Sequence, residues 1–230
     1  YRTGNSISAE LARRLPSTLL LASVSLALAV AVGIPLGVLA ALKRGSMLDV
    51  ASRLLALLGA AVPSYVLALL LMLFFAVKLD WLPALGYGSP KNLALPALAL
   101  SFGVMAQLMR LTRATMLDVL GQDYMRTARA KGLSEAAVVW GHALKNALIP
   151  VVTVLGTSAG HLLGGAVIIE TIFGWPGVGQ FVVVGISQRD YPVVQGFVLY
   201  LAVVFLIVNL AVDSIYRWLD PRLHFGRQPA

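Results

Sequence analysis

Long apolar stretches, separated by short polar ones, dominate the order of residues in this chain. Five of these stretches carry almost no charge, and they cover residues 17–42, 54–77, 93–109, 147–169 and 192–215. A helix rises about 1.5 Å per residue and the hydrocarbon core of a bilayer is about 30 Å thick, so stretches of this length are typical of membrane-spanning helices. The pattern therefore predicts an all-α polytopic membrane protein with five transmembrane helices.

Polar residues and helix breakers divide the chain between these spans. Residues 1–16 are polar, and we expect a short amphipathic helix there that ends at Pro16, in an external juxtamembrane segment. Pro63 interrupts the second span. The stretch 78–92, with its prolines, glycines and aromatic residues, and the glycine-rich stretch 170–191 are both typical of loops outside the hydrocarbon core.

The composition excludes a soluble globular domain, and the placement of charge predicts an orientation. Hydrophobic residues make up 59% and charged residues 12% of the chain, and the mean hydropathy is +0.84. Twelve of the 18 Lys and Arg fall on one side of the predicted spans, in the turn after the first span, in residues 110–146 and in the tail. Basic flanks stay in the cytoplasm, so we attribute the net charge of +8 to orientation rather than to nucleic-acid binding.

This orientation places residues 110–146 and the tail, 218–230, in the cytoplasm and residues 1–16 outside. The number of spans is then odd. A chain that starts in the cytoplasm would need a sixth, N-terminal helix before Tyr1.

The sequence offers no set of residues suited to catalysis or to holding a metal or cofactor. It has no cysteine and no GxxxxGK[ST] phosphate loop, and His142, His161 and His224 are far apart. We therefore expect no catalytic site, metal site or cofactor site in this chain. Two other classes are less consistent with the sequence: a secondary transporter would show inverted repeats with paired carboxylates, and a membrane enzyme a clustered catalytic set.

Residues 110–146 form the longest polar interval. We expect the third span to overrun into the cytoplasm and to be followed by two short helices hinged at Gly132, the second of them capped by Ser134. The second helix would have an apolar side made of Ala136, Val139 and Trp140. Such a surface outside the bilayer indicates a protein partner, the alternative being a helix that lies on anionic lipid.

This interval also resembles a known family. The stretch DYMRTARAKGLSEAAVVWGHALKNALIPVV is similar to the cytoplasmic EAA loop of permeases in binding-protein-dependent ABC importers, in the form typical of the dipeptide, oligopeptide and nickel group. Further similar stretches follow the same order along the chain: ARRLPSTLLLA, IPLGVLAALKRGSMLD, VPSYVLALLLMLFF and VIIETIFGWPGVGQFVVVGISQRDYPVVQG. The general motif has Glu-Ala-Ala where this chain has Arg126, Thr127 and Ala128, so the role of the Glu does not transfer, whereas Gly132 matches.

The resemblance implies a MetI-like type I importer fold in the bacterial inner membrane. It implies as partners a second permease subunit, two ABC ATPase subunits and an external solute-binding protein, with no nucleic acid. Residues 17–217 would be the permease domain, and its coupling loop at about 113–146 would dock the ATPase. The docking residues would be Arg126, Thr127, Ala128, Arg129, Lys131, Gly132, Leu133, Ser134 and Ala136. Dipeptides or oligopeptides are the expected solutes, with nickel, glutathione or another small solute as alternatives.

Polar groups within the spans are the candidates for a translocation path, namely His161, Glu170 and Asp213. Arg110 and Arg113 are expected to extend to the cytoplasmic interface. The glycines at 156, 160 and 164 favour close helix packing over pore lining. Trp175 lies in an external loop, either as an interfacial turn or, by resemblance, near the translocation path and the docked receptor.

Overall fold

The computed structural model describes residues 6–219, and over that range the chain is helical with no strand. The elements are α1 (Ile7–Leu42), α2 (Met47–Ala61), α3 (Ser64–Leu71), the π-helix η1 (Met72–Lys78), α4 (Pro90–Leu120), α5 (Asp123–Ala130), the π-helix η2 (Ala137–Ala143), α6 (Leu144–Phe173), α7 (Val178–Ser187) and α8 (Tyr191–Leu219). The all-helical prediction is confirmed.

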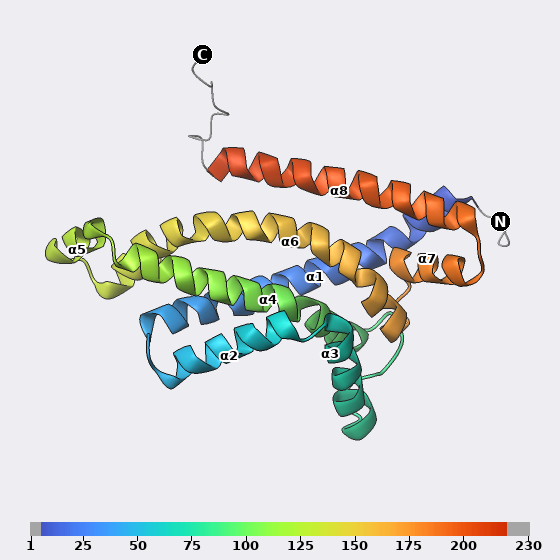
Figure 1. The fold of residues 1–230 in the computed structure, drawn as a ribbon, viewed down its shortest axis with the longest axis horizontal. Coiled ribbons are helices and arrows are strands. Elements are labelled where there is room, and N and C mark those ends of the chain that lie inside the picture. The colour runs from blue at the N-terminus through green and yellow to red at the C-terminus, as the bar shows by residue number, and fades with distance from the viewer. Residues whose placement is uncertain (1–5, 220–230) are drawn as a thin grey trace, which may run out of the picture.

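The long helices α1, α4, α6 and α8 run lengthwise beside one another (Figure 1). The α1–α4 pair has the most extensive contact in the molecule. Small residues allow this approach, because a Cβ at Gly37 would lie 2.6 Å from the carbonyl oxygen of Met109 and one at Gly33 would lie 2.7 Å from that of Met105. Gly33 and Gly37, both in the first span, are therefore packing positions.

Four helical segments are individually long and apolar enough to cross a membrane: 7–42, 90–120, 137–164 and 191–210. The predicted second span instead consists of α2 followed by α3 and η1, bent by 107° at Pro63. In Figure 1, α3 leaves the direction of the bundle. A second bent pair joins Ala166–Phe173 to Val178–Ser187 at 79°, so the described residues hold four spans, or up to six if each bent pair counts as one. The interruption predicted at Pro63 is a sharp corner.

The expected helix end at Pro16 is wrong, because α1 continues through this residue. Proline removes one helical hydrogen bond, but tertiary contacts hold both sides of the site. Before it, the guanidinium of Arg14 lies 5.0 Å from the centroid of the Phe181 ring. After it, the buried Thr18 hydrogen-bonds across to α6 and α7. Residues 7–16 are therefore part of the helical bundle.

The stretch 170–191, expected to be a glycine-rich loop, contains helix α7. Val178 and Val182 are buried, and they supply the apolar face that stabilises this helix against α1 and α6. The predicted overrun of the third span is confirmed, since α4 extends to Leu120.

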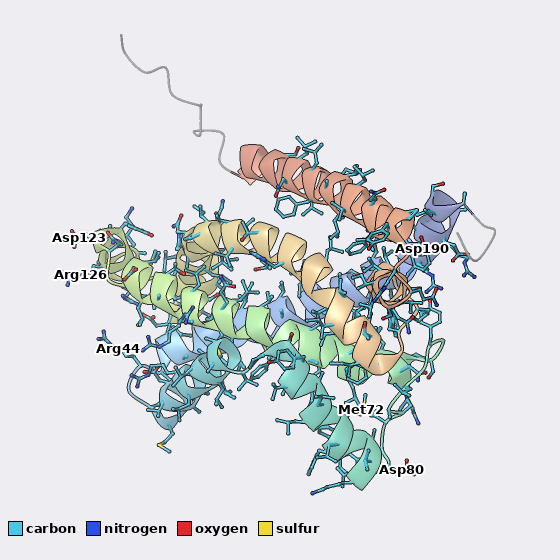
Figure 2. All side chains as sticks on the ribbon, turned by 45° about the vertical axis from the view of Figure 1, so that its right-hand side comes forward. Arg44, Met72, Asp80, Asp123, Arg126 and Asp190 are labelled. Atoms are coloured by element: carbon cyan, nitrogen blue, oxygen red, sulfur yellow. The ribbon has the colours of Figure 1, made fainter. Side chains whose placement is uncertain are left out.

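Basic segments that the sequence assigned to one side of the membrane lie at the same end of the bundle. Figure 2 shows Arg44, Asp123 and Arg126 at one end, and Asp80 and Asp190 toward the other. The turn after α1 and the interval around α5 thus share an end, as the orientation prediction requires. The tail, 218–230, lies almost entirely outside the described residues.

Candidate functional site

Helix α5 packs on the ends of the long helices mainly through one side chain, that of Met125. Met125 is the buried residue of this helix, and Ala128, one turn later, is half-buried beside it. Both pack on a cluster contributed by α1, α4, η2 and α6: Val38, Ala41, Met116, Val138, Val139, Ala143 and Ala147. The sequence DYMRTARA is otherwise polar, so the spacing of Met125 and Ala128 decides which face of the short helix turns inward.

A tight turn at Gly132 reverses the chain after α5. Gly132 has φ +80°, a left-handed conformation that side chains with a Cβ disfavour, and the backbone N–H groups of Lys131 and Gly132 donate to the carbonyl oxygens of Thr127 and Arg129. The hydroxyl of Ser134 then accepts from the N–H of Ala137 at 3.3 Å. The predicted hinge and cap are therefore both present.

An ion pair spans this turn. Nε of Arg129 donates to Oε1 of Glu135 at 2.7 Å and its Nη2 donates to Oε2 at 3.4 Å. These hydrogen bonds hold the pKa of Glu135 below its ordinary value. Arg129, expected to pair with a partner protein, thus already has an acceptor within the chain, and Arg126 lies 3.8 Å from Asp123.

The second short helix differs from the prediction. The helix that begins after Ser134 passes through η2 and continues into α6 without a break. Its apolar residues also do not share one side: Val139 is buried in the cluster under α5, whereas Ala136 and Trp140 are exposed. Burial against α1, α4 and α5 draws Val138 and Val139 inward, and this tertiary contact could not be read from helical spacing alone.

What remains outside is a mixed basic and apolar patch, which we call the loop surface. Its members are exposed: Tyr124, Arg126, Thr127, Arg129, Lys131, Gly132, Leu133, Ser134, Ala136 and Trp140. It includes every predicted docking residue except the half-buried Ala128. Three large apolar side chains, Tyr124, Leu133 and Trp140, are 41–55% exposed at this end of the molecule. An exposed apolar group rimmed by basic residues is typical of a protein-binding surface.

At the opposite end, Glu170 ties α6 to α1 and α7. It is fully buried, its Oε1 accepts from the Thr18 hydroxyl at 2.7 Å, and its Oε2 accepts from the N–H of Gln180 at 3.0 Å. A Cβ at Gly177 would overlap the carboxylate, so glycine is required where α7 crosses it. Glu170, predicted as a path residue, is thus enclosed by protein, an arrangement that favours a structural role.

Trp175 is also a packing residue rather than an interfacial one. It is 1% exposed, and its Nε1 donates to the carbonyl oxygen of Ser17 at 2.9 Å. The ring of Tyr87 meets it edge-on with centroids 4.8 Å apart. The glycines and proline of FGWPG suggested a surface turn. The burial of Trp175 gave no signal in the sequence, because its partners Ser17 and Tyr87 lie far away along the chain.

His161 occupies a different environment, since it is exposed and lines two cavities. One, of about 470 Å³, lies between α6 and α8, and the other, of about 280 Å³, lies at the corner between α2 and α3. Of the glycines expected to pack closely, Gly160 does, because a Cβ there would lie 3.0 Å from the Phe205 ring, whereas Gly164 faces open space in the larger cavity. The side chain of Asp213 lies outside the described residues.

A buried ion pair between α2 and α4 was missed from the sequence. Nη2 of Arg113 donates to Oδ2 of Asp49 at 3.1 Å, Nε donates to Oδ1, and Asp49 is 1% exposed. Arg113 therefore does not simply extend to the membrane interface, whereas Arg110 is exposed. Only the occurrence of an Asp in the first turn of α2 hinted at this contact, because its partner lies 64 residues away.

Several known proteins similar to this chain are transport permeases. Residues 33–225 match the family described as "Binding-protein-dependent transport system inner membrane component". The dipeptide transport system permease protein DppB of Bacillus subtilis is 45% identical over 99% of this chain and 74% of its own length. The glutathione transport system permease protein GsiC of Escherichia coli K12 is 42% identical over 95% and 72%.

Solved structures support the same architecture. An inward-facing structure of the MetNI methionine ABC transporter superposes with a TM-score of 0.73 at 21% identity, covering 91% of this chain and 96% of the other. At that identity the similarity establishes the fold, which is the MetI-like fold expected from the sequence. Within the described residues, no group of three His, Asp or Glu is placed to hold a metal ion.

Proposed function

This chain belongs to the family of binding-protein-dependent transport system inner membrane components, and we propose that it imports short peptides, driven by a partner ATPase that docks on its loop surface. As a multi-pass permease subunit of an ABC importer of the inner membrane, it belongs to a non-catalytic class of proteins. The importer would contain a second permease, two ATPase subunits and an external solute-binding protein.

The observation that carries the docking proposal is the exposed apolar group on the loop surface. Leu133 and Trp140 are exposed at the end of the molecule that also carries most of the basic residues. Helix α6 runs from this end into the bundle. An apolar groove on an ATPase would bury Leu133, and Arg126 and Lys131 would contribute charged contacts at its rim. The turn at Gly132 gives this protrusion a defined shape.

Peptides are the proposed solutes because of the names of the relatives. Two dipeptide permeases, from Bacillus subtilis and Alkalihalophilus pseudofirmus, are 45% and 39% identical to this chain, and a glutathione permease is 42% identical. Glutathione is itself a modified tripeptide. It is therefore the second candidate, and the shared chemistry is that of a short peptide.

The docking proposal is tested by Leu133→Glu in the assembled importer. We expect the variant to insert and to pair with its partner permease, but to retain at least about tenfold less ATPase on affinity purification, because burial of a charge opposes docking. Met47→Glu is the matched control, since Met47 is an 84% exposed apolar residue that begins α2 at the same end of the molecule. Wild-type ATPase capture by the Leu133 variant would refute the assignment.

The solute is tested separately by uptake into proteoliposomes that contain the wild-type importer and its receptor. Labelled dialanine, glutathione and Ni²⁺ are offered in turn, with ATP inside the vesicles. We expect ATP-dependent uptake of dialanine. Uptake of Ni²⁺ alone would overturn the peptide proposal while leaving the docking proposal standing.

A further inference from the structure

A half-open cavity with a largely apolar lining and a few polar side chains lies where α2 ends and α3 begins. Its volume is about 280 Å³, near the lower end of the range for small-molecule sites. Four polar side chains from three helices line it: Ser64 on α3, Gln107 on α4, and Ser158 and His161 on α6. All four come from segments predicted to cross the membrane, where polar side chains are rare and need partners.

None of these four side chains has a hydrogen-bond partner among the described residues. The strongest case is Ser158, which is 3% exposed. Other hydroxyls of α6 satisfy themselves within the helix, since Thr153 donates to the carbonyl oxygen of Ile149 and Thr157 to that of Val154. The Ser158 hydroxyl makes no such bond, so its donor and acceptor are both available to a molecule in the cavity.

The broken helix begins at the same cavity, since Ser64, its first residue, lines it. Pro63 is the N-cap of α3, and no side chain caps this end. The N–H groups of Ser64 and Tyr65 therefore lack acceptors within the helix, and they carry the partial positive charge of a helix N-terminus. In membrane transporters, helices broken in this way present such ends to oxygen-bearing solutes.

The chemistry of the lining selects a class of ligand. No Asp, Glu, Lys or Arg lines the cavity. Its hydroxyls, amide, imidazole and free N–H groups can all donate, and they suit the carbonyl and carboxylate oxygens that every peptide main chain carries. A subsite with these donors and no charged side chain would recognise the main-chain oxygens that all peptides share.

We propose that this cavity is a main-chain subsite on the solute path, in which Ser158, Gln107 and the start of α3 hydrogen-bond the oxygens of a passing peptide. The proposal rests on the proposed function as a peptide importer and assigns a place for the solute within this chain. His161, predicted as a path residue, lies at the margin of this subsite and of the neighbouring cavity between α6 and α8.

Cysteine protection tests occupancy directly. The chain has no cysteine, so Ser64→Cys introduces its single thiol, whose modification by a methanethiosulfonate reagent is followed by mass spectrometry of this subunit in the assembled importer. We expect excess dialanine to slow modification at least about twofold, as half occupancy requires, and the same concentration of sorbitol to leave it unchanged. Equal slowing by sorbitol, no slowing by dialanine, or a thiol sealed off by the partner permease would overturn the proposal.

Uptake tests whether occupancy matters. We expect Ser158→Ala to lower the maximal rate of dialanine uptake roughly three- to tenfold, the effect of one hydrogen bond, with ATPase capture unchanged. Ser101→Ala is the matched control, because Ser101 is equally buried but donates to the carbonyl oxygen of Leu98 and does not line the cavity.

The two proposals fail in different ways. A wild-type importer that takes up no dialanine would refute the peptide function itself. An active wild type with an equally active Ser158→Ala variant, or with equal losses in both serine variants, would refute the subsite alone.

Discussion

Truncation of Met125 tests how the loop surface is held. Helix α5 has eight residues, well below the roughly 12–15 that an isolated helix needs to be stable in water. Met125 is its one buried residue and is fully enclosed by the cluster around Val38 and Val138. We therefore expect the position of α5 to depend on this side chain.

The size of the effect follows from burial. Replacing a buried Met by Ala costs about 2–5 kcal/mol, whereas burying the Met side chain supplies only about 1.5–3 kcal/mol in the first place. The loss therefore equals or exceeds what the anchor contributes, and α5 should detach locally while the long helices stay packed. Met125→Leu, which conserves volume, should cost less than about 1.5 kcal/mol.

Two measurements check this expectation. The first is the alkylation rate of Ala128→Cys, at a half-buried position on the inner face of α5. This rate should rise at least about tenfold when Met125→Ala is added, because 1.4 kcal/mol of local opening corresponds to that factor. The second is ATPase capture, which should fall in parallel. Unchanged alkylation in the double variant would refute the view that Met125 anchors α5.

Two further predictions concern the turn and the far end of the bundle. Gly132→Ala should destabilise the turn by about 1–2 kcal/mol. The cause is the left-handed backbone and not a clash, since no atom lies within 4 Å of a Cβ there. Gly132→Asn should cost less, and hydrogen exchange of residues 131–134 measures the cost of both the Ala and the Asn variant. Gly132→Pro should abolish ATPase capture. Thr18→Val should lower the stability of the purified protein by about 1.5–3 kcal/mol, because the buried carboxylate of Glu170 loses a donor. In thermal unfolding, Ser25→Ala is its control, since Ser25 donates to the carbonyl oxygen of Leu21 within its own helix, and an equal loss in both variants would show that the Glu170 contact is not special.

Hydropathy predicted the spans because lipid imposes a strong rule on composition, and the turn chemistry of Gly132 and Ser134 was readable because it is local. Positive φ at a glycine and an N-cap serine depend on residues within one helical turn. These parts of the site were therefore predicted correctly, together with the exposure of Arg126, Lys131 and Leu133.

The failures share one physical cause, which is contact between residues far apart in sequence. The contacts of Thr18 with Glu170 and of Ser17 with Trp175 join residues 152 and 158 positions apart. They carry α1 through Pro16 and fold the expected loop after Glu170 into α7. Local propensity gives no signal for such contacts. The prediction therefore ended the first helix at Pro16 and did not foresee that Thr18 and Glu170 are buried together.

Helix α6 connects the loop surface to the proposed solute subsite. The helix that starts after Ser134 contributes Trp140 to the loop surface, Ser158 and His161 to the cavity, and Glu170 to the buried anchor at its far end. Because it is anchored at Glu170, a displacement applied near Gly132 would tilt α6 about that end and not slide it along its axis. The cavity lies between the two ends, against the corner of α2 and α3. A tilt of α6 would therefore move Ser158 relative to the start of α3, and the donors proposed to hold a peptide would separate if a docked ATPase displaced the loop surface. Under the proposed function, solute release would then need no moving part other than α6.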